Sequence, residues 1–370
     1  MATDRKLGPP GKKKLLALDG GGIRGAMTIE VLAGIETMIR REFSNDALVL
    51  ADYFDFVGGT STGAILAAAI SKGMSTQKLR IFYEQSGPAM FDKASLLKRF
   101  RYKYGQESLA GELKEVFGAE TNLGSDELKT MLVMVMRNAT TDSPWPVSNN
   151  PKAKYNNTGD DNDNLRIPLW QLIRASTAAP VYFPPEEIVI GKNTFLFVDG
   201  GVTMFNNPAF QMFLMATMPA YGVKWPTGDK DMLIVSVGTG HAAAANADLD
   251  ASDMNLLYNA GSVPSALMAA ALHQQDMLCR AFGKCLLGDS IDREIGDMIA
   301  AQNPGGQSLF TYMRYNAELT DDGLSRLGLS GIDPERVREL DSVNNIGDLQ
   351  EIGKAVAKLV DRRHFGGFLK

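Results

Sequence analysis

The sequence predicts an α/β fold with a mainly parallel central sheet flanked by helices, followed by a mostly helical C-terminal extension. Between residues 15 and 240, short apolar runs without polar alternation alternate with segments of helical periodicity. Such runs are typical of strands that are buried on both faces of a parallel sheet. Three of the runs end in glycine-rich turns, as strands often do where an α/β domain passes from sheet to helix.

The first strand and helix are predicted directly after a polar, basic N-terminal segment. We expect residues 1–14 to form a flexible tail, because they combine two prolines with a lysine cluster. Residues 15–18 are the first strand candidate, and apolar residues recur at helical spacing from residue 26 to residue 43. A glycine-rich loop joins the two elements.

The same order of strand, glycine turn and helix is then repeated. Residues 53–57 are a buried-strand candidate, residues 58–63 turn the chain, and residues 64–70 form a compact apolar helix. Further strands are expected at residues 131–136, 194–198 and 232–237, and helices at 109–117, 169–177 and 209–218. We expect these elements to form one α/β core over residues 15–240.

Two regions depart from this alternation. Residues 142–166 hold three prolines and a long polar run, which predicts a long loop and a candidate mobile lid. Residues 241–370 are expected to form an extension packed on the same core, with helices at 264–282, 334–340 and 348–360 and a strand at 309–315.

Composition excludes several classes of protein. Against 38 Lys and Arg stand 43 Asp and Glu, and this mild acidity argues against broad nucleic-acid binding. The two cysteines, Cys279 and Cys285, form no metal-ligand pattern, so we expect buried free thiols, no metal and no cofactor. With neither a signal-peptide core nor an apolar run of spanning length, the expectation is a cytoplasmic protein whose membrane contact is at most peripheral.

The first glycine-rich turn runs from Asp19 to Gly25 and reads Asp-Gly-Gly-Gly-Ile-Arg-Gly. Free backbone N–H groups at the start of a helix bind negative charge, so this loop suits an oxyanion or a phosphate. Its Gly20, Gly22 and Gly25 also fit the dinucleotide-binding fingerprint, and Asp46 follows about 20 residues later, as that fingerprint requires. The loop alone leaves these alternatives open.

The second turn places a candidate nucleophile, Ser61, between Gly59 and Gly63 in a G-x-S-x-G element. A serine hydroxyl needs a positioned base, and two candidates follow in the chain. His241 would complete a triad of Ser61, Asp199 and His241 in the chain order of α/β-hydrolases. Alternatively Asp199, which begins the third turn, Asp-Gly-Gly, could act as the base directly if burial raises its pKa.

Taken together, the three turns resemble the patatin-like phospholipase family. The resemblance extends to Arg-Ala-Ser-Thr-Ala-Ala-Pro at residues 174–180, Asn-Asn-Pro at 206–208 and Ser-Val-Gly-Thr-Gly at 236–240. Ala64 departs from it, standing where the family usually has glycine.

The resemblance implies a three-layer fold and a role for each turn. Ser61 would be the nucleophile of a Ser-Asp dyad and Asp199 its base, and the amides of Gly20, Gly21 and Gly22 would form the oxyanion hole. The expected activity is a phospholipase A or lysophospholipase reaction on membrane phospholipids, at a transiently contacted membrane surface. Gating by an activator and a nucleotide-binding module stay as alternatives, and the oligomeric state stays open.

Overall fold

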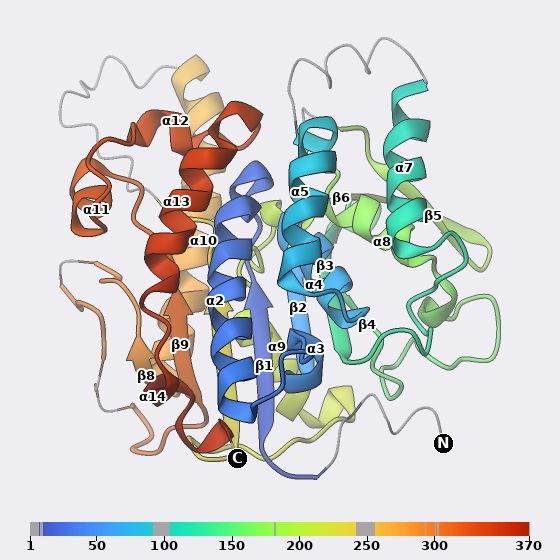
Figure 1. The fold of residues 1–370 in the computed structure, drawn as a ribbon. Coiled ribbons are helices and arrows are strands. Elements are labelled where there is room, and N and C mark those ends of the chain that lie inside the picture. Colours follow the sequence, from blue (N-terminus) through green and yellow to red (C-terminus); the bar gives the residue numbers. More distant parts are fainter. Residues whose placement is uncertain are drawn as a thin grey trace.

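The computed structural model describes residues 7, 10–91, 104–180, 183–241, 256–292, 294–299, 301 and 303–369. Within these residues one nine-stranded sheet runs through the centre in the order β5-β6-β3-β2-β1-β7-β9-β8, with β4 paired to β3 (Figure 1). The strands are β1 (Lys13–Leu18), β2 (Phe56–Thr60), β3 (Met131–Asn138), β4 (Ser143–Ser148), β5 (Glu186–Ile190), β6 (Asn193–Asp199), β7 (Met232–Val237), β8 (Lys284–Leu287) and β9 (Thr311–Tyr315).

Helices cover both faces of this sheet. The longer ones are α2 (Gly25–Phe43), α4 (Thr62–Ser71), α5 (Thr76–Phe91), α7 (Tyr104–Phe117), α8 (Leu169–Ser176), α9 (Ala209–Thr217), α10 (Leu256–Phe282) and α13 (Ile346–Ala357). The shorter ones are α3 (Leu50–Tyr53), α11 (Asp321–Arg326), α12 (Pro334–Arg338), α14 (Arg362–Phe365) and the 3-10 turns η1 (Gly22–Arg24), η2 (Asn164–Arg166), η3 (Gly200–Val202), η4 (Pro219–Tyr221), η5 (Val343–Asn345) and η6 (Gly366–Leu369).

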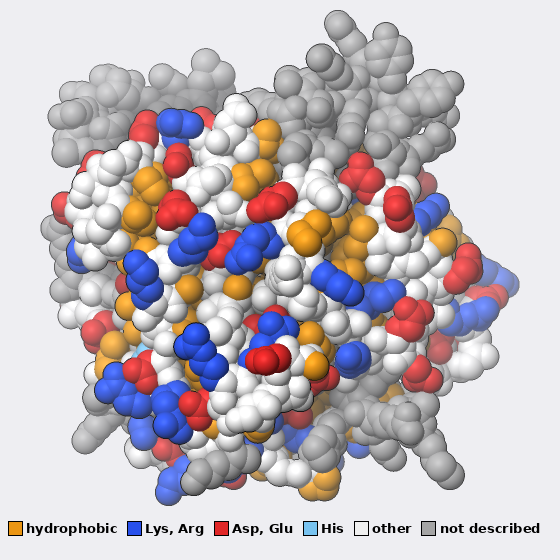
Figure 2. All heavy atoms as spheres, viewed as in Figure 1, with side chains coloured by type: hydrophobic (Ala, Val, Ile, Leu, Met, Phe, Trp, Pro, Cys, Tyr) orange, Lys and Arg blue, Asp and Glu red, His pale blue; other side chains and the backbone are white. Residues whose placement is uncertain are grey.

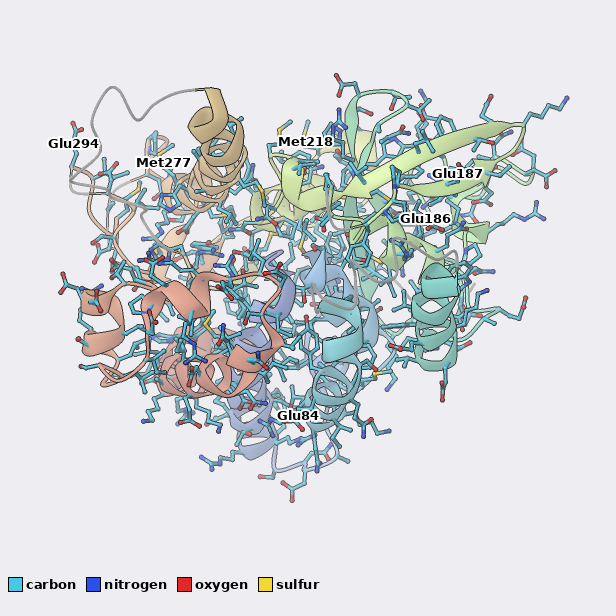
Figure 3. All side chains as sticks on the ribbon, turned by 90° about the horizontal axis from the view of Figure 1, so that it is seen from above. Glu84, Glu186, Glu187, Met218, Met277 and Glu294 are labelled. Atoms are coloured by element: carbon cyan, nitrogen blue, oxygen red, sulfur yellow. The ribbon has the colours of Figure 1, made fainter. Side chains whose placement is uncertain are left out.

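The sheet is buried on both faces, and β1 shows why its strands carry uninterrupted apolar runs: alternate residues point into different cores. Leu16 and Leu18 belong to the core that α2, α4, α8 and α13 cover, whereas Leu15 and Ala17 belong to the core under α9 and α10. Seen from above, Glu84 on α5 lies on one side of the sheet, and Met277 on α10 and Met218 after α9 lie on the other (Figure 3). The predicted α/β fold with a mainly parallel, helix-flanked sheet is therefore confirmed.

The face that α2, α5 and α13 present to solvent has a mixed character. Figure 2 shows basic and acidic side chains intermingled over it, with apolar side chains scattered between them. Separately, in the part of the chain that the structure describes, no helix combines the length and the apolar character needed to cross a membrane.

Several predicted boundaries need correction. β1 begins at Lys13, inside the expected tail, because Lys13 already pairs with Met232 of β7. The Lys13 ammonium lies over the Trp225 ring and donates to the carbonyl of Leu7. Most of the remaining tail lies outside the described residues. β2 begins later than expected, at Phe56, and runs through Gly58 and Gly59, so the turn starts only at Ser61.

The long loop expected over residues 142–166 is shorter than predicted, because residues 143–148 form the strand β4 and, beyond it, only residues 149–163 lack helix or strand. Pro144 and Pro146 are tolerated there since β4 pairs with β3 alone in the described sheet, which leaves its other edge without ladder bonds. Beyond the strand, the Asn156 amide donates to the carbonyls of Ser148 and Asn150 at 2.8 and 2.7 Å. One short polar side chain thus holds together the turns that follow β4.

The C-terminal region contributes to the central sheet itself. β9 pairs with β7 and β8 pairs with β9, both in parallel, and β8 was not anticipated from the sequence. Helix α10 begins at Leu256, eight residues before the expected start. Helix α12 begins at Pro334 as predicted, and the Asp333 side chain before it accepts from the amide of Glu335. The division into a core over residues 15–240 and an extension over 241–370 remains a prediction about folding units.

A buried ion-pair network joins this region to the first strand. Arg314 of β9 donates to Asp19 at 2.5 and 3.2 Å and to the Ser236 hydroxyl of β7 at 2.7 Å. Its Nε lies 3.6 Å from Asp276 of α10, which also accepts from the Tyr312 hydroxyl. Asp19 immediately precedes the glycine loop, so the network fixes the point from which that loop departs.

Replacing Arg314 with methionine should destabilise the protein strongly. Removing one partner of a buried ion pair leaves the other charge unpaired, and the expected loss is about 3–5 kcal/mol in the free energy of unfolding. Urea denaturation measures it. Arg363→Met, which removes an exposed arginine paired with Asp361, is the control and should leave the midpoint unchanged. Equal midpoints for the two variants would contradict the structural role of Arg314.

Candidate active site

Ser61 occupies a backbone conformation that side chains rarely adopt. It follows β2 and precedes α4 with φ 53° and ψ −123°. Its amide donates to the hydroxyl of Ser176 at 3.0 Å, and that hydroxyl donates to the carbonyl of Val135 at 2.5 Å. The strained turn is therefore tied to α8 and to β3, and it leaves the Ser61 side chain partly exposed.

The glycines on either side of Ser61 are required by close backbone packing. A Cβ at Gly59 would clash with the carbonyl of Gly63, and a Cβ at Gly63 would clash with the carbonyl of Leu18 in β1. Strand, turn and helix can approach this closely only without side chains at these positions. The predicted turn glycines thus serve the geometry of Ser61.

The pairing of β3 explains how Ser61 meets Asp199. On one edge of β3, β2 runs parallel and ends with Thr60 opposite Val135. Along the same edge β6 runs antiparallel and ends with Asp199 opposite Met136, the next residue of β3. The two strands therefore approach each other end to end. The Ser61 hydroxyl donates to Oδ2 of Asp199 at 2.6 Å.

The carboxyl of Asp199 is held in a buried position. Only 5% of the residue is exposed, and its other oxygen, Oδ1, accepts from the amide of Gly201 at 2.6 Å. Burial raises the pKa of Asp199 to about 6, although the hydrogen bonds from Ser61 and Gly201 favour the ionised form. The carboxyl is therefore a stronger base than an ordinary aspartate.

The glycine loop lies beside this pair, between the ends of β2 and β7. Gly20 leaves no space for a side chain, since a Cβ there would clash with Oδ1 of Asn206 and lie 3.2 Å from the Cβ of Ser61. Its amide donates to the carbonyl of Asn206 at 3.1 Å, and its carbonyl accepts from the Thr239 hydroxyl at 2.8 Å. The expectation that the Gly20 amide is an oxyanion donor needs correction, because that N–H is already bonded.

Two amides of the loop remain as donors. Gly21 and Gly22 stand at the start of η1, where the helix itself offers their N–H groups no acceptor. The next amide, that of Ile23, donates to the carbonyl of Leu340 at 2.9 Å. That carbonyl packs so closely on Gly22 that a Cβ there would clash with it, and Gly22 has a φ of 57°. The C-terminal region thus holds the loop in place.

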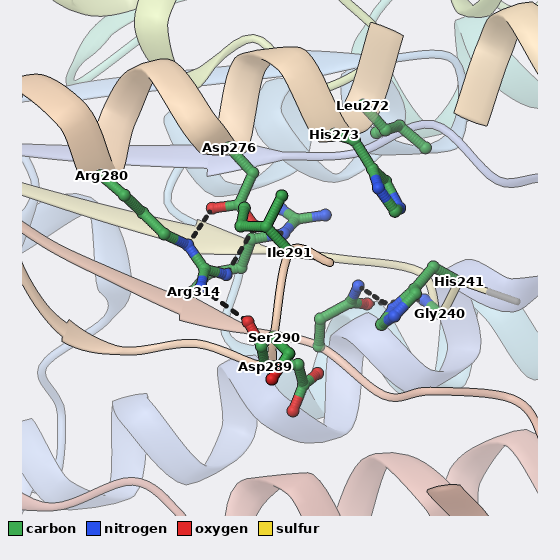
Figure 4. A pocket seen from close by; sticks show the side chains of 11 residues that line it. Gly240, His241, Leu272, His273, Asp276, Arg280, Asp289, Ser290, Ile291 and Arg314 are labelled. Atoms are coloured by element: carbon green, nitrogen blue, oxygen red, sulfur yellow. Dashed lines mark hydrogen bonds and ion pairs between the residues drawn. The ribbon is translucent and has the colours of Figure 1, made fainter. Parts of the chain in front are cut away.

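His241 has other partners than the predicted triad. Its Nδ1 lies 3.0 Å from the side-chain amide of Asn316, and its ring centroid lies 5.8 Å from that of His273 (Figure 4). No hydrogen bond joins it to Ser61 or Asp199 in the described part of the chain. Burial and the nearby Arg314 lower the pKa of His241 to about 4, so it is neutral at pH 7.

The dinucleotide alternative fails on the position of Asp46. This exposed residue follows the C-terminal end of α2, whereas the glycine loop lies at the N-terminal end. The helix has 19 residues and is about 28 Å long at about 1.5 Å per residue. Asp46 therefore cannot meet a ribose held at the loop.

Two further observations concern the cysteines and metals. Cys279 and Cys285 are both buried free thiols, as expected. Among the residues that the structure describes, no three His, Cys, Asp or Glu side chains are grouped so that they could hold a metal ion.

Three residues with clear roles in the geometry were not singled out from the sequence. Ser176 anchors the amide of Ser61, and Asn206 and Leu340 accept from the glycine loop through their backbone carbonyls. The serine of the 174–180 segment could have been noticed as a polar side chain on the buried side of an amphipathic helix. A backbone acceptor has no such signature in the sequence.

Comparison with known proteins gives consistent relatives. The family model described as patatin-like phospholipase matches residues 16–213, more than half of the chain. Patatin group J-1 of Solanum tuberosum is 30% identical over 243 residues, which cover 61% of this chain and 60% of the relative. Patatin-17 of Solanum cardiophyllum is 30% identical over 249 residues, with the same coverage. The match thus spans about 60% of the length of these curated relatives.

Among solved structures, VipD from Legionella pneumophila aligns with 94% of this chain and 66% of its own, at a TM-score of 0.40 and 15% identity. A likeness at that level is too weak to support a conclusion. The family model is sufficient on its own, since it covers the strands and turns that bring Ser61 and Asp199 together. The chain belongs to the patatin-like phospholipase family, as its three glycine-rich turns had suggested.

Proposed function

We propose that this protein is a lipid acyl hydrolase of the phospholipase A or lysophospholipase type, with Ser61 as nucleophile and Asp199 as base. The observation that carries the proposal is the 2.6 Å hydrogen bond from the Ser61 hydroxyl to a buried carboxyl. Family membership and the patatin relatives support an ester of a lipid as substrate. The proposed site of action is a membrane surface reached from the cytoplasm, and the reaction needs no cofactor.

In the first half of the reaction, Oδ2 of Asp199 accepts the proton as the Ser61 oxygen attacks the ester carbonyl. The carbonyl oxygen becomes an oxyanion, which the amides of Gly21 and Gly22 stabilise. When the tetrahedral intermediate collapses, the bond to the alcohol breaks and Asp199 returns the proton to that leaving oxygen. The products are a free lysophospholipid or glycerophosphodiester and an acyl group on Ser61.

In the second half, water takes the place of the alcohol. Asp199 accepts a proton from the water as it attacks the acyl group, and the same amides hold the second oxyanion. Collapse releases the fatty acid and returns the proton to the Ser61 oxygen. One water is consumed for each ester cleaved, and no other co-reactant is required.

The surroundings of Asp199 suit this exchange of a single proton. A pKa of about 6 lies close to neutral pH, where a base is ionised yet still accepts a proton readily. The Gly201 amide fixes Oδ1, so Oδ2 remains directed at Ser61. A histidine is not needed between them, and the neutral, amide-bonded His241 is outside the proposed mechanism.

The first test compares three variants on a short-chain chromogenic ester and on phospholipid. Ser61→Ala should lose hydrolysis, because the acyl acceptor is gone. Asp199→Asn keeps the shape of the side chain but cannot take the proton, and kcat should fall by about 10²–10⁴-fold. His241→Ala is the control and should retain the rate of the parent protein.

Two results would contradict the proposal. Hydrolysis by Ser61→Ala at the parental rate would exclude Ser61 as nucleophile. A dead His241→Ala protein beside a weakly affected Asp199→Asn protein would favour the triad instead. Intact-mass detection of an acyl adduct, present in the parent and absent from Ser61→Ala, provides a readout that does not depend on turnover.

The second test is the pH dependence of kcat/KM with an uncharged ester. Asp199 acts as a base only when ionised, so activity should be lost as pH falls through its raised pKa. We expect a fall of about tenfold per pH unit below pH 6 and a plateau above it. The His241→Ala profile should coincide with that of the parent. An acid limb centred near pH 4 would contradict Asp199 as the base, because it would fit either His241, whose pKa is lowered to about 4, or an ordinary exposed carboxylate.

A further inference from the structure

The N-terminal half of α10 carries no charged residue. From Leu256 to Gln275 the helix contains no Asp, Glu, Lys or Arg. Residues 266–272 read Ala-Leu-Met-Ala-Ala-Ala-Leu, and none of these side chains is buried. A helix of a folded protein ordinarily turns its apolar residues inward, so an exposed apolar segment of this length indicates a contact partner.

The position of α10 in the fold explains why this segment is uncovered. The C-terminal half packs on the sheet through buried Cys279 and on α9 through the ring contact between Phe282 and Phe210. The N-terminal half rises above the upper ends of the described strands (Figure 1). The upper ends of the parallel strands are also where the Ser61–Asp199 pair lies.

A second apolar element meets α10 beside the dyad. A Cβ at Gly201 would lie 3.5 Å from the methyl of Met268, and the Gly201 amide holds Asp199. Just beyond Gly201, Val202 and Met204 are 42% and 50% exposed, while Leu267 on α10 is 65% exposed. We call Val202, Met204, Leu267 and Met268 the apolar rim. It combines two distant parts of the chain that approach each other at Gly201 and Met268.

We propose that the apolar rim is the surface through which the protein docks on a lipid bilayer, with the acyl chains as its occupant. This inference rests on the proposed function, because the acyl group of the substrate must reach Ser61. Gly201, whose amide holds Asp199, lies against Met268, and Asp199 accepts from the Ser61 hydroxyl, so the rim begins next to the position of the ester carbonyl. An acyl chain that leaves the ester carbonyl past Gly201 stays in contact with apolar side chains.

The composition of the surface also predicts the kind of attraction. Neither the rim nor residues 256–275 carry a charge, so docking depends on removing apolar side chains from water. It should therefore occur on zwitterionic lipid and be insensitive to salt, unlike docking through a basic patch. This differs from the mixed-charge face of α2, α5 and α13 (Figure 2).

The experiment measures co-sedimentation with phosphatidylcholine vesicles for the Ser61→Ala, Ser61→Ala/Leu267→Glu and Ser61→Ala/Ile81→Glu proteins. Ser61→Ala prevents the vesicles from being degraded. Leu267→Glu should weaken binding about tenfold, the effect of withdrawing one leucine side chain from an apolar contact. Ile81, 45% exposed on α5, is the matched control, and Ile81→Glu should bind as Ser61→Ala does. Raising NaCl from about 0.1 to 1 M should not release the protein.

A parallel measurement separates this inference from the proposed function. With Ser61 intact, Leu267→Glu should reduce vesicle hydrolysis relative to hydrolysis of a water-soluble short-chain ester, and Ile81→Glu should leave that ratio unchanged. Failure of all proteins to hydrolyse any ester would count against the proposed function, while the binding comparison would still decide the role of the rim.

Three results would overturn the docking surface. The first is equal vesicle binding by Ser61→Ala and its Leu267→Glu derivative, and the second is no binding by either. The third is a change of oligomeric state in Leu267→Glu, measured by light scattering, with vesicle binding retained. That result would assign the rim to a second copy of the chain.

Discussion

The hydrogen bond between Ser61 and Asp199 depends on one unusual feature of the sheet, the end-to-end approach of β2 and β6 along a single edge of β3. A purely parallel sheet would place both strand ends at the same level but on separate edges. Here β6 runs antiparallel to β3, so its last residue, Asp199, pairs with Met136 of β3. Thr60, the last residue of β2, pairs with the neighbouring Val135. The remaining features of the site hold these two strand ends in position or occupy the space around them.

Backbone contacts do most of this positioning. Three positions in the site require glycine. A Cβ at Gly20 would clash with a side-chain oxygen, and a Cβ at Gly59 or Gly63 would clash with a backbone carbonyl. The strain at Ser61 persists because Ser176 and Val135 fix the turn from two directions. With the Gly20 amide bonded to Asn206 and that of Ile23 to Leu340, the donors that remain are those of Gly21 and Gly22.

Much of the fold could be predicted because burial on both faces of a sheet leaves a distinct pattern, as residues 15–18 and 232–237 show. Ser61 and Asp199 were singled out from motifs, and the family resemblance implied that they act as a pair. The strand pairing that brings them together was not predicted, since the direction of β6 is set by tertiary pairing. The strand β4 was missed because its prolines are permitted only at a free edge. Gly20 was misjudged because residue order does not reveal which amides are already bonded.

The C-terminal region is part of the site although the family model ends at residue 213. Arg314 fixes Asp19 at the start of the glycine loop, the Leu340 carbonyl fixes Ile23 within it, and Met268 packs beside the turn that holds Asp199. These contacts come from β9, from the segment after α12 and from α10, so three separate elements converge on it. A change in how this region packs would therefore move the Gly21 and Gly22 amides and the apolar rim together. The proposed docking surface and the proposed dyad thus depend on the same elements, so a change in the packing of one is expected to alter the other.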